Sequence, residues 1–458
     1  MFGFLKPGSP KPMVPKDQIL SVYHSKRFRA LIGVFLGYAA FYIVRNNFAL
    51  STPYLQSVLE LSKSQIGFLT SSMLIAYGIS KGVMSSISDK CSPKKFMVFG
   101  LIMCALMNIF MGFASSLTMF LVLIVLNGFF QGFGVGPSFI TIAKWYPKSA
   151  RGRVGAIWNI SHNVGGGIIA PIVAAAFFFV SQEHWRIASY TVPALIAILI
   201  AVIVYQLIKE SPEREGLPTT SEITGEQNDK NDTTEQAKEA ANLSAGQIFY
   251  RYVFKNKNAW FVSLVDTFVY LIRFGILTWI PIYLLQVKGF SKAEMAVAFL
   301  FFEFAAIPST LFAGYISDKL FKGYRMPPAI ISLLIIIFCI FGYWQATSLT
   351  TVTIFAAIIG CLIYIPQFLA SVQTMEIVPP FAVGSAVGLR GFMSYIVGAS
   401  GGTSLYGIIV DRMGWDGGFY LLIGGAVLCI IFCLLAHRGA KQLKAELEAT
   451  KHVEHYNH

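Results

Sequence analysis

The fold of this chain is decided by residues 28–50, an apolar run that reads FRALIGVFLGYAAFYIVRNNFAL and contains Arg45. A charge at the centre of a membrane helix costs about 2.5 to 3.5 kcal/mol on insertion scales, so such a residue faces a bundle interior or a wet cavity. A second apolar run contains Tyr270-Leu271-Ile272-Arg273, and Arg273 follows Arg45 by 228 residues in a chain of 458. The two arginines therefore predict a membrane protein built from two similar halves.

The composition supports a membrane protein independently of any motif. Hydrophobic residues make up 55% of the chain, charged residues only 13%, and the mean hydropathy is +0.62. Soluble domains are typically about 25% charged. The formal net charge is +13, but the basic residues mostly flank apolar runs, which is a topology signal rather than a nucleic-acid patch. We expect a lipid bilayer and no nucleic acid as partner.

Six cysteines without a CxxC pair read as small core residues, so we expect neither disulfides nor a metal site.

A chain of this length holds about twelve spans of about 20 residues. The predicted fold class is an all-α membrane protein with twelve transmembrane helices in two six-helix halves. The expected spans are about 28–50, 64–87, 95–114, 118–143, 154–180, 187–209, 258–286, 293–316, 327–345, 349–372, 383–410 and 418–437.

The chain divides into two halves and a connector. Residues 1–209 form the N-terminal half, and residues 258–458 form the C-terminal half with a tail. Residues 210–257 are polar and rich in acids at first, which predicts a flexible linker. Ser244 and Gln247 then read as a capping box that opens a short interfacial helix before the seventh span.

Basic residues gather in every second loop, and this asymmetry predicts how the chain is oriented in the membrane. Two of the intervening loops, 114–116 and 346–348, carry no charge. Positive charge collects on the cytoplasmic side, so we expect a multi-pass protein of the bacterial inner membrane with both termini in the cytoplasm. The basic residues in question are Lys26, Arg27, Arg29, Lys90, Lys94, Lys95, Lys144, Lys148, Arg151, Arg153, Lys319, Lys322, Arg325, Arg438, Lys441 and Lys444.

Short motifs repeat between the halves. Ser62-Lys63 matches Ser291-Lys292, and Ser88-Asp89-Lys90 matches Ser317-Asp318-Lys319, each 229 residues apart. Six helices per half give both halves the same topology, so the halves are related by an axis along the membrane normal. Asp89 and Asp318 are expected in gating loops, where they cap helix N-termini or pair with basic partners across the interface between the halves. The alternative is a solvated polar turn.

Polar residues accompany the two arginines at helical spacing, and cations outnumber acids inside the spans. A surplus of positive charge at mid-membrane requires an anion, and guanidinium binds phosphate oxygens bidentately. Two opposed arginines thus predict a phosphate clamp, the alternative being structural pairing with an acid on a neighbouring helix. The faces are Tyr38, Tyr42 and Arg45 in one half, and Asp266, Tyr270 and Arg273 in the other.

Three further ionisable residues have a functional and a structural interpretation. Lys81 could reach the anion or extend to the membrane interface. His162, which shares a face with Asn159 and Asn163, could line the site or be an ordinary core residue. Glu303 could bind a proton or neutralise a cation of the clamp.

Several stretches resemble the organophosphate:phosphate antiporter family of the major facilitator superfamily, and the resemblance covers the chain outside the central linker. Within the family, residues 134–140 and 373–379 are similar to members that carry phosphoglycerate. In the first gating loop Ser85 replaces the glycine of the superfamily motif. The stretches that carry the resemblance are 37–48, 77–81, 151–152, 158–163 and 269–273.

The resemblance implies a transporter rather than an enzyme, without a cofactor. It implies that Arg45 and Arg273 bind phosphate and that Lys81 and His162 assist. The residues it places around the pocket are Tyr38, Tyr42, Asn159 and Tyr270.

Arg390 suggests the substrate class. It has no acid three or four residues away, and an unpaired cation would suit a second anionic group such as a carboxylate. We therefore expect a monomeric antiporter that exchanges phosphoglycerate or phosphoenolpyruvate for inorganic phosphate by alternating access. Two other interpretations of Arg390 remain, a position in water near a helix end and pairing with Asp266.

Two alternative functions stay open at this point. One is a proton-coupled organophosphate symporter that uses Glu303, Asp266 or His162. The other is a transporter-like receptor that binds a sugar phosphate and signals to a membrane kinase.

Overall fold

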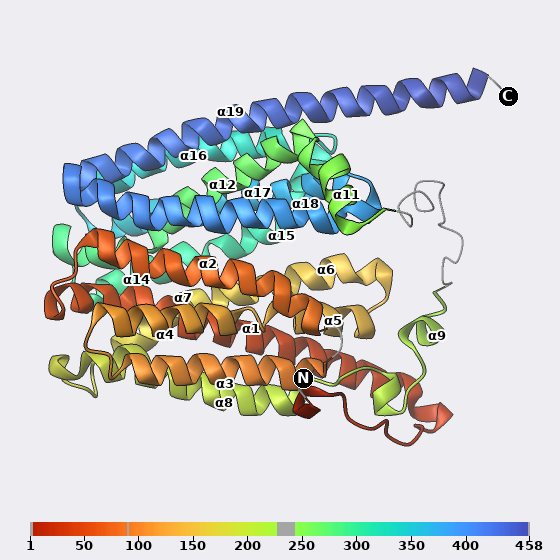
Figure 1. The fold of residues 1–458 in the computed structure, drawn as a ribbon, viewed down its shortest axis with the longest axis horizontal. Coiled ribbons are helices and arrows are strands. Elements are labelled where there is room, and N and C mark those ends of the chain that lie inside the picture. Colours follow the sequence, from red (N-terminus) through yellow and green to blue (C-terminus); the bar gives the residue numbers. More distant parts are fainter. Residues whose placement is uncertain (1–2, 89–90, 227–242, 457–458) are drawn as a thin grey trace.

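The structure is a computed structural model that describes residues 3–88, 91–226 and 243–456. All regular structure in these residues is helical, which confirms the predicted fold class. Figure 1 shows the first six spans, red to yellow-green, lying against the second six, green to blue.

The N-terminal half begins with two short 3-10 turns before its first long helix. The elements are η1 (Gly3–Leu5), η2 (Lys16–Gln18), α1 (Ile19–Val58), α2 (Lys63–Ser88), α3 (Pro93–Met111), α4 (Leu117–Gln131), α5 (Val135–Trp145), α6 (Lys148–Asn159), α7 (Ser161–Ala176), η3 (Gln182–His184), η4 (Ile187–Thr191) and α8 (Val192–Leu207).

Short elements connect the halves, and the second half then follows. They are η5 (Glu213–Glu215), α9 (Thr220–Thr224), α11 (Ala245–Ile248), η6 (Phe249–Phe254), α12 (Lys257–Leu277), α13 (Ile280–Ile282), η7 (Tyr283–Val287), α14 (Lys292–Phe304), α15 (Ala306–Leu320), α16 (Met326–Gln345), α17 (Leu349–Glu376), η8 (Pro380–Ala382), α18 (Val383–Phe392), η9 (Met393–Ala399), η10 (Gly401–Leu405) and α19 (Tyr406–Tyr456).

Within the described residues, ten helical stretches are long and apolar enough to cross a membrane. The predicted fifth span is not among them because it is divided into α6 and α7. The last two predicted spans fall in one continuous stretch, residues 383–445. Gly414 separates them with a φ of +75°, a conformation that favours glycine. Each of the twelve predicted spans therefore has a helical counterpart.

The two ends of the helix bundle differ in how the halves meet. We call the end that carries α9, α11 and the start of α1 the linker end (right in Figure 1). The far end carries the turns between α1 and α2 and between η7 and α14. At the far end one buried apolar cluster is continuous across both halves, from Leu55 and Ile66 to Trp279. The far end is therefore closed by packing.

Polar contacts reinforce this closure of the far end. The Asp411 carboxylate of the second half accepts hydrogen bonds from the backbone N–H groups of Lys63 (3.2 Å) and Ser64 (2.7 Å) at the start of α2. The amide of Gln286 donates to Gln56 at 3.0 Å. A carboxylate at a helix N-terminus is favourable because unpaired N–H groups point outward there.

At the linker end, the N-terminal residues bind the start of the linker. Residues 5–14, which we call the N-terminal strap, lie alongside it, and the Val14 N–H donates to the Gly216 carbonyl at 2.8 Å. The Glu215 carboxylate accepts from Lys11 and Lys26, both at 2.8 Å. The prediction that the whole linker is flexible is thus wrong for residues 210–226. Composition could not indicate this docking, because the cations that neutralise Glu215 come from the N-terminal end of the chain.

The rest of the connector agrees with the sequence where it is described. Ser244 and Gln247 form the predicted capping box, with the Ser244 N–H donating to the Gln247 side chain at 2.8 Å and the Gln247 N–H to the Ser244 hydroxyl at 3.3 Å. This box opens α11, which continues through η6 into α12 and the C-terminal half.

Candidate functional site

Arg45 lies in α1 with its guanidinium covered by tyrosine rings. Its Cζ is 3.8 Å from the ring centroid of Tyr77 and 4.6 Å from that of Tyr42. The side chain is only 3% exposed, and its Nε and Nη2 have no hydrogen-bond partner among the described residues. Cation–π contact stabilises the charge but leaves these two nitrogens without an acceptor.

A break in α1 directly precedes Arg45. Val44 has non-helical backbone angles (φ −93°, ψ 15°), and its carbonyl accepts from the amides of Asn108 (3.0 Å) and Asn127 (3.1 Å). Because the carbonyl is released from the helix and then bound by two side chains, the kink is held in place. This fixes the position of the arginine that follows.

Arg273 occupies the corresponding place in α12. Its Cζ is 4.6 Å from the Tyr364 ring centroid and 5.3 Å from that of Phe274. Its Nη1 donates to the Gln367 side chain at 3.5 Å, a long contact, and its buried Nε has no partner among the described residues. No ion pair found in the described part of the chain includes Arg45 or Arg273.

Ring contacts join the two arginines across the interface between the halves. Tyr42, which contacts Arg45, lies 5.3 Å from the His162 ring, and His162 lies 5.5 Å from Tyr364, which contacts Arg273. His162 is 4% exposed, its Nδ1 lies against the Asn159 carbonyl, and its Nε2 has no partner in the described chain. The structure thus brings His162, Tyr42 and Asn159 together with both arginines.

A second set of aromatic contacts includes residues that the sequence did not single out. Tyr395 in η9 lies 5.1 Å from the Tyr77 ring and 5.0 Å from the Tyr270 ring. The Lys81 ammonium lies over Tyr395, 5.9 Å from its centroid, and the Tyr38 and Tyr77 hydroxyls are 3.2 Å apart.

Tyr77, Tyr364 and Tyr395 are therefore additions to the predicted set. Spacing offered a signal only for Tyr77, which lies four residues before Lys81. Tyr364 and Tyr395 reach the site by the packing of α17 and η9, which no local pattern encodes.

Glu303 in α14 is fully buried and bridges the halves. Its Oε2 accepts from the Asn163 amide of the first half at 2.9 Å and from the Tyr364 hydroxyl at 3.2 Å, while its Oε1 has no hydrogen-bond partner among the described residues. Gly167 makes this approach possible, since a Cβ there would lie 2.7 Å from Phe304. Close contact of α7 and α14 agrees with the glycine run that the sequence shows.

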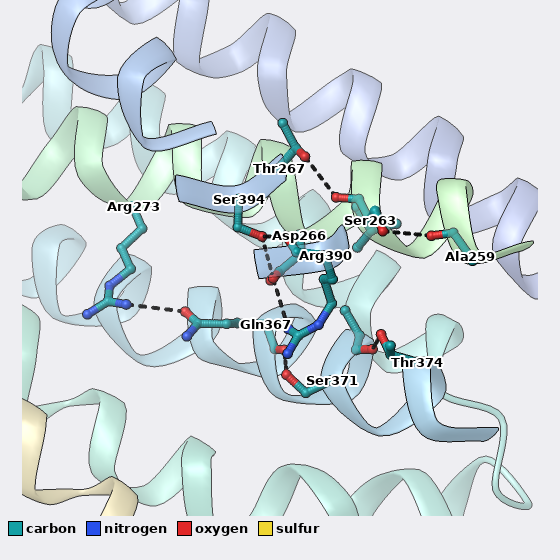
Figure 2. A network of polar contacts seen from close by, with 12 residues as sticks. Ala259, Ser263, Asp266, Thr267, Arg273, Gln367, Ser371, Thr374, Arg390 and Ser394 are labelled. Atoms are coloured by element: carbon teal, nitrogen blue, oxygen red, sulfur yellow. Dashed lines mark hydrogen bonds and ion pairs between the residues drawn. The ribbon is translucent and has the colours of Figure 1, made fainter. Parts of the chain in front are cut away.

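Arg390 is not an unpaired cation, and this expectation is corrected. Its Nη1 donates to the Asp266 carboxylate at 2.9 Å, and the Ser394 hydroxyl donates to the same oxygen at 2.6 Å (Figure 2). Asp266 is 1% exposed, so the pair is largely removed from water. Of the alternatives given for Arg390, the structure shows the pairing with Asp266, which spacing within one helix could not indicate because Asp266 lies in α12, 124 residues away.

The predicted gating acids do not bridge the halves within the described residues. Asp318 pairs with Arg325, which also binds Glu376, all in the C-terminal half. Asp318 therefore ties together the linker ends of its own half, contrary to the cross-interface pairing expected. Asp89 lies outside the described residues.

The comparisons with known proteins agree with this fold. Residues 34–402 match the family model of the Major Facilitator Superfamily. The chain is 62% identical over 452 residues to the phosphoglycerate transporter protein of Salmonella typhimurium, covering 99% of this chain and 98% of that one. It is 35% identical to the glycerol-3-phosphate transporter of Bacillus subtilis, covering 96% and 99% of the two chains.

A further relative and a solved structure extend the comparison. The hexose-6-phosphate:phosphate antiporter of Escherichia coli is 34% identical and covers 88% of each chain. A bacterial homolog of the human lysosomal transporter Spinster, solved in an inward-facing and unoccupied conformation, has a TM-score of 0.73 at 18% identity, covering 90% of this chain and 97% of that one. At that identity the likeness concerns the fold alone. The chain is a multi-pass membrane protein that belongs to the Major Facilitator Superfamily and, within it, to the family of these organophosphate transporters.

Proposed function

We propose that this chain exchanges a phosphorylated three-carbon acid, phosphoglycerate or phosphoenolpyruvate, for inorganic phosphate across the bacterial inner membrane. The observation that carries the proposal is the pair of buried guanidiniums, Arg45 and Arg273, one from each half and neither in an ion pair within the described residues. The 62% identity to a phosphoglycerate transporter over nearly the whole chain supports the substrate class.

An anion between the arginines would relieve an electrostatic cost. A buried charge whose partner is missing destabilises a protein by about 3–5 kcal/mol. A phosphate group offers oxygens to both guanidiniums and accepts two parallel hydrogen bonds from each. Binding therefore lowers the energy of the state in which the halves lie close together, whichever side the anion came from.

This coupling explains obligatory exchange. Without an anion the two cations repel one another, so the empty protein pays a high cost for passing between its conformations. With phosphate or an organophosphate bound, the cost falls and the halves can rock about the site. Inorganic phosphate carried one way then allows the organophosphate to be carried the other way.

The orientation follows from the same proposal. If both termini are cytoplasmic, as the basic loops suggest, the far end faces outward and is closed by Asp411, Gln286 and the apolar cluster. Because both arginines come from one chain, a monomer suffices for transport.

The remaining site residues receive supporting roles. The Lys81 ammonium and the His162 imidazole add donors near the clamp. The rings of Tyr38, Tyr42 and Tyr270, with the Asn159 carbonyl that holds His162, shape the walls. Arg390 is the candidate for the substrate carboxylate, with Asp266 as its resident partner.

Phosphate counterflow in proteoliposomes tests the exchange. Liposomes loaded with phosphate should take up labelled phosphate, and external 3-phosphoglycerate should compete better than glycerol 3-phosphate. Arg45→Lys and Arg273→Lys should each lower counterflow strongly, while Arg438→Lys, an exposed arginine in α19, serves as the matched control. If both site variants retained full exchange, the clamp would be wrong, and binding without any counterflow would favour the receptor.

The second candidate function, a proton-coupled symporter, has one observation in its favour. Glu303 is fully buried between the halves, and a buried carboxylate that binds and releases a proton could couple transport to a proton gradient. Glu303→Gln retains the size and the acceptor oxygen but cannot titrate. If uptake driven by a pH gradient alone occurs in the native protein and disappears in this variant, the symporter replaces the antiporter.

A further inference from the structure

The pair of Arg390 and Asp266 raises a question that the phosphate clamp does not answer. Arg390 lies in α18, and its Nη1 is bound by the Asp266 carboxylate of α12. Its buried Nε has no hydrogen-bond partner within the described chain, and neither has the Asp266 Oδ1. The cation is therefore neutralised but not saturated with acceptors.

A site that exchanges two different anions must keep its buried cations compensated with each of them. A phosphorylated acid brings a carboxylate in addition to its phosphate, whereas inorganic phosphate brings none. An extra arginine that served only the carboxylate would be left unpaired whenever phosphate was bound, which is unfavourable in a buried setting. An internal carboxylate that can take the place of the substrate carboxylate removes this difficulty.

We propose that Asp266 is a specificity-determining counter-ion that holds Arg390 while the site contains inorganic phosphate and yields it to the carboxylate of a phosphorylated acid. The inference rests on the proposed exchange function and deepens it. Ser394 makes the change of partner feasible, because its hydroxyl donates to the Asp266 carboxylate at 2.6 Å independently of Arg390. Asp266 thus keeps a donor when the guanidinium turns toward the substrate.

The spacing along α12 suits a short acid. Asp266 precedes Arg273 by seven residues, which places them about 10 Å apart along the helix axis. A phosphate on Arg273 and a carboxylate on the Arg390 side would be joined by the three-carbon chain and one hydrogen bond at each end. In Figure 2 the Gln367 side chain, 3.5 Å from the Arg273 guanidinium, lies between the two arginines. Gln367 could contact the middle of the substrate.

The inference separates substrates by charge rather than by size. Glycerol 3-phosphate has a hydroxyl where phosphoglycerate has a carboxylate, and a neutral hydroxyl cannot displace Asp266 from a guanidinium. Such substrates would bind with the internal pair intact, as phosphate does. A carboxylated substrate gains a charge-assisted hydrogen bond to Arg390, while the bond between Arg390 and Asp266 is lost. The strength of that internal bond therefore sets how much better carboxylated substrates bind than glycerol 3-phosphate.

Asp266→Asn tests this role because it frees Arg390 permanently. In phosphate-loaded proteoliposomes, 3-phosphoglycerate and phosphoenolpyruvate should compete better relative to glycerol 3-phosphate, by about 10-fold, the order expected for one charged hydrogen bond. The advantage should vanish in Asp266→Asn combined with Arg390→Gln, since the effect acts through the guanidinium. Asp416→Asn, an exposed aspartate at the far end, is the matched control.

Three results would overturn the inference. In the first, Asp266→Asn weakens all substrates by one factor, as a purely structural carboxylate would. In the second, it shifts preference toward glycerol 3-phosphate. In the third, the preference for carboxylated substrates persists in the double variant. Because the double variant leaves no charge unpaired, it still provides this test if the single variant does not fold. Loss of phosphate counterflow in the native protein would instead refute the exchange function itself.

Discussion

The two halves share their backbone packing but differ in their chemistry. In the N-terminal half Gly165 of α7 lies against the Ala39 carbonyl of α1, and in the C-terminal half Gly398 of η9 lies against the Thr267 carbonyl of α12. Ala39 and Thr267 each precede the arginine of their half by six residues. The repeat thus keeps a glycine contact that sets the distance between the first and fifth helices of each half.

The surroundings of the arginines have diverged. Arg45 is surrounded by tyrosines, whereas near Arg273 the C-terminal half supplies Gln367 and two buried acids, Asp266 and Glu303. A half with only a cation and rings offers a general phosphate contact. A half that also contains acids can discriminate between substrates and respond to them. The comparison teaches that the fold constrains the backbone contacts while substrate selection is free to settle in one half.

The largest expected effect tests whether both halves hold the phosphate. Arg45→Lys and Arg273→Lys should each lower kcat/KM for phosphate counterflow by about 100-fold, because lysine loses the bidentate geometry and its charged hydrogen bonds are worth about 1.5–3 kcal/mol each. Initial rates over a range of substrate concentrations give the value. A large loss in only one variant would assign the phosphate to one half and break the symmetry.

The glycine contacts should have equal weight in the two halves. Gly165→Ala and Gly398→Ala would place a Cβ 2.0 and 2.2 Å from a carbonyl oxygen, so each should destabilise the protein by about 1–3 kcal/mol, typical of overpacking. Thermal unfolding in detergent, followed by tryptophan fluorescence, measures the change. Gly155→Ala and Gly384→Ala, where a Cβ meets nothing within 4 Å, are the controls. Unequal losses of stability would show that the two glycine contacts do not contribute equally in the two halves.

The helix N-termini at the far end differ between the halves in a way that can be tested. The start of α14 is capped within its own half by Ser291 and Glu294, whereas the start of α2 is also capped by Asp411 of the opposite half. Asp411→Ala should weaken far-end closure by about 1 kcal/mol, a roughly five-fold shift in population. Labelling of Gln56→Cys by an impermeant thiol reagent should accelerate accordingly. Glu294→Ala, which removes a cap within one half, should not change that rate.

The smallest effect concerns the N-terminal strap, for which the described part of the C-terminal half has no counterpart. Partial burial raises the pKa of Glu215, but the hydrogen bonds from Lys11 and Lys26 outweigh it, so the pKa lies below its ordinary value. The stabilisation is therefore present above about pH 4.3, the usual glutamate pKa, and is lost as the pH falls below it. Proteolysis of the strap should accelerate on acidification, and Glu215→Gln should remove that pH dependence.

Much of the architecture could be predicted from the sequence because membrane insertion leaves a local signal. Twelve apolar runs and the repeat offset of about half the chain indicated two six-helix halves, and the relatives confirm the superfamily. Arg45 and Arg273 were identifiable because a charge inside an apolar run is costly wherever its partner lies. Their helix-face neighbours Tyr38, Tyr42 and Tyr270 followed from spacing alone.

Contacts between distant segments were not predictable in the same way. The linker segment that docks through Glu215 and the ion pair of Asp266 with Arg390 both join residues more than 100 positions apart. Asp318 was expected to cap a helix N-terminus or to pair across the halves, yet it pairs with Arg325 of its own half. Each of these depends on which helix faces pack together.

The sequence by itself therefore determined that the chain spans the membrane in two similar halves and that each half contributes one buried arginine. The cost of placing a charge or an unpaired backbone polar group inside the membrane depends on that residue and its neighbours along the chain, so the sequence reveals it. The tertiary structure decided which of those charges are outside any ion pair in the described part of the chain. It left Arg45 and Arg273 available to an anion and gave Arg390 to Asp266, because neutralisation depends on distances between helices that the order of residues does not specify.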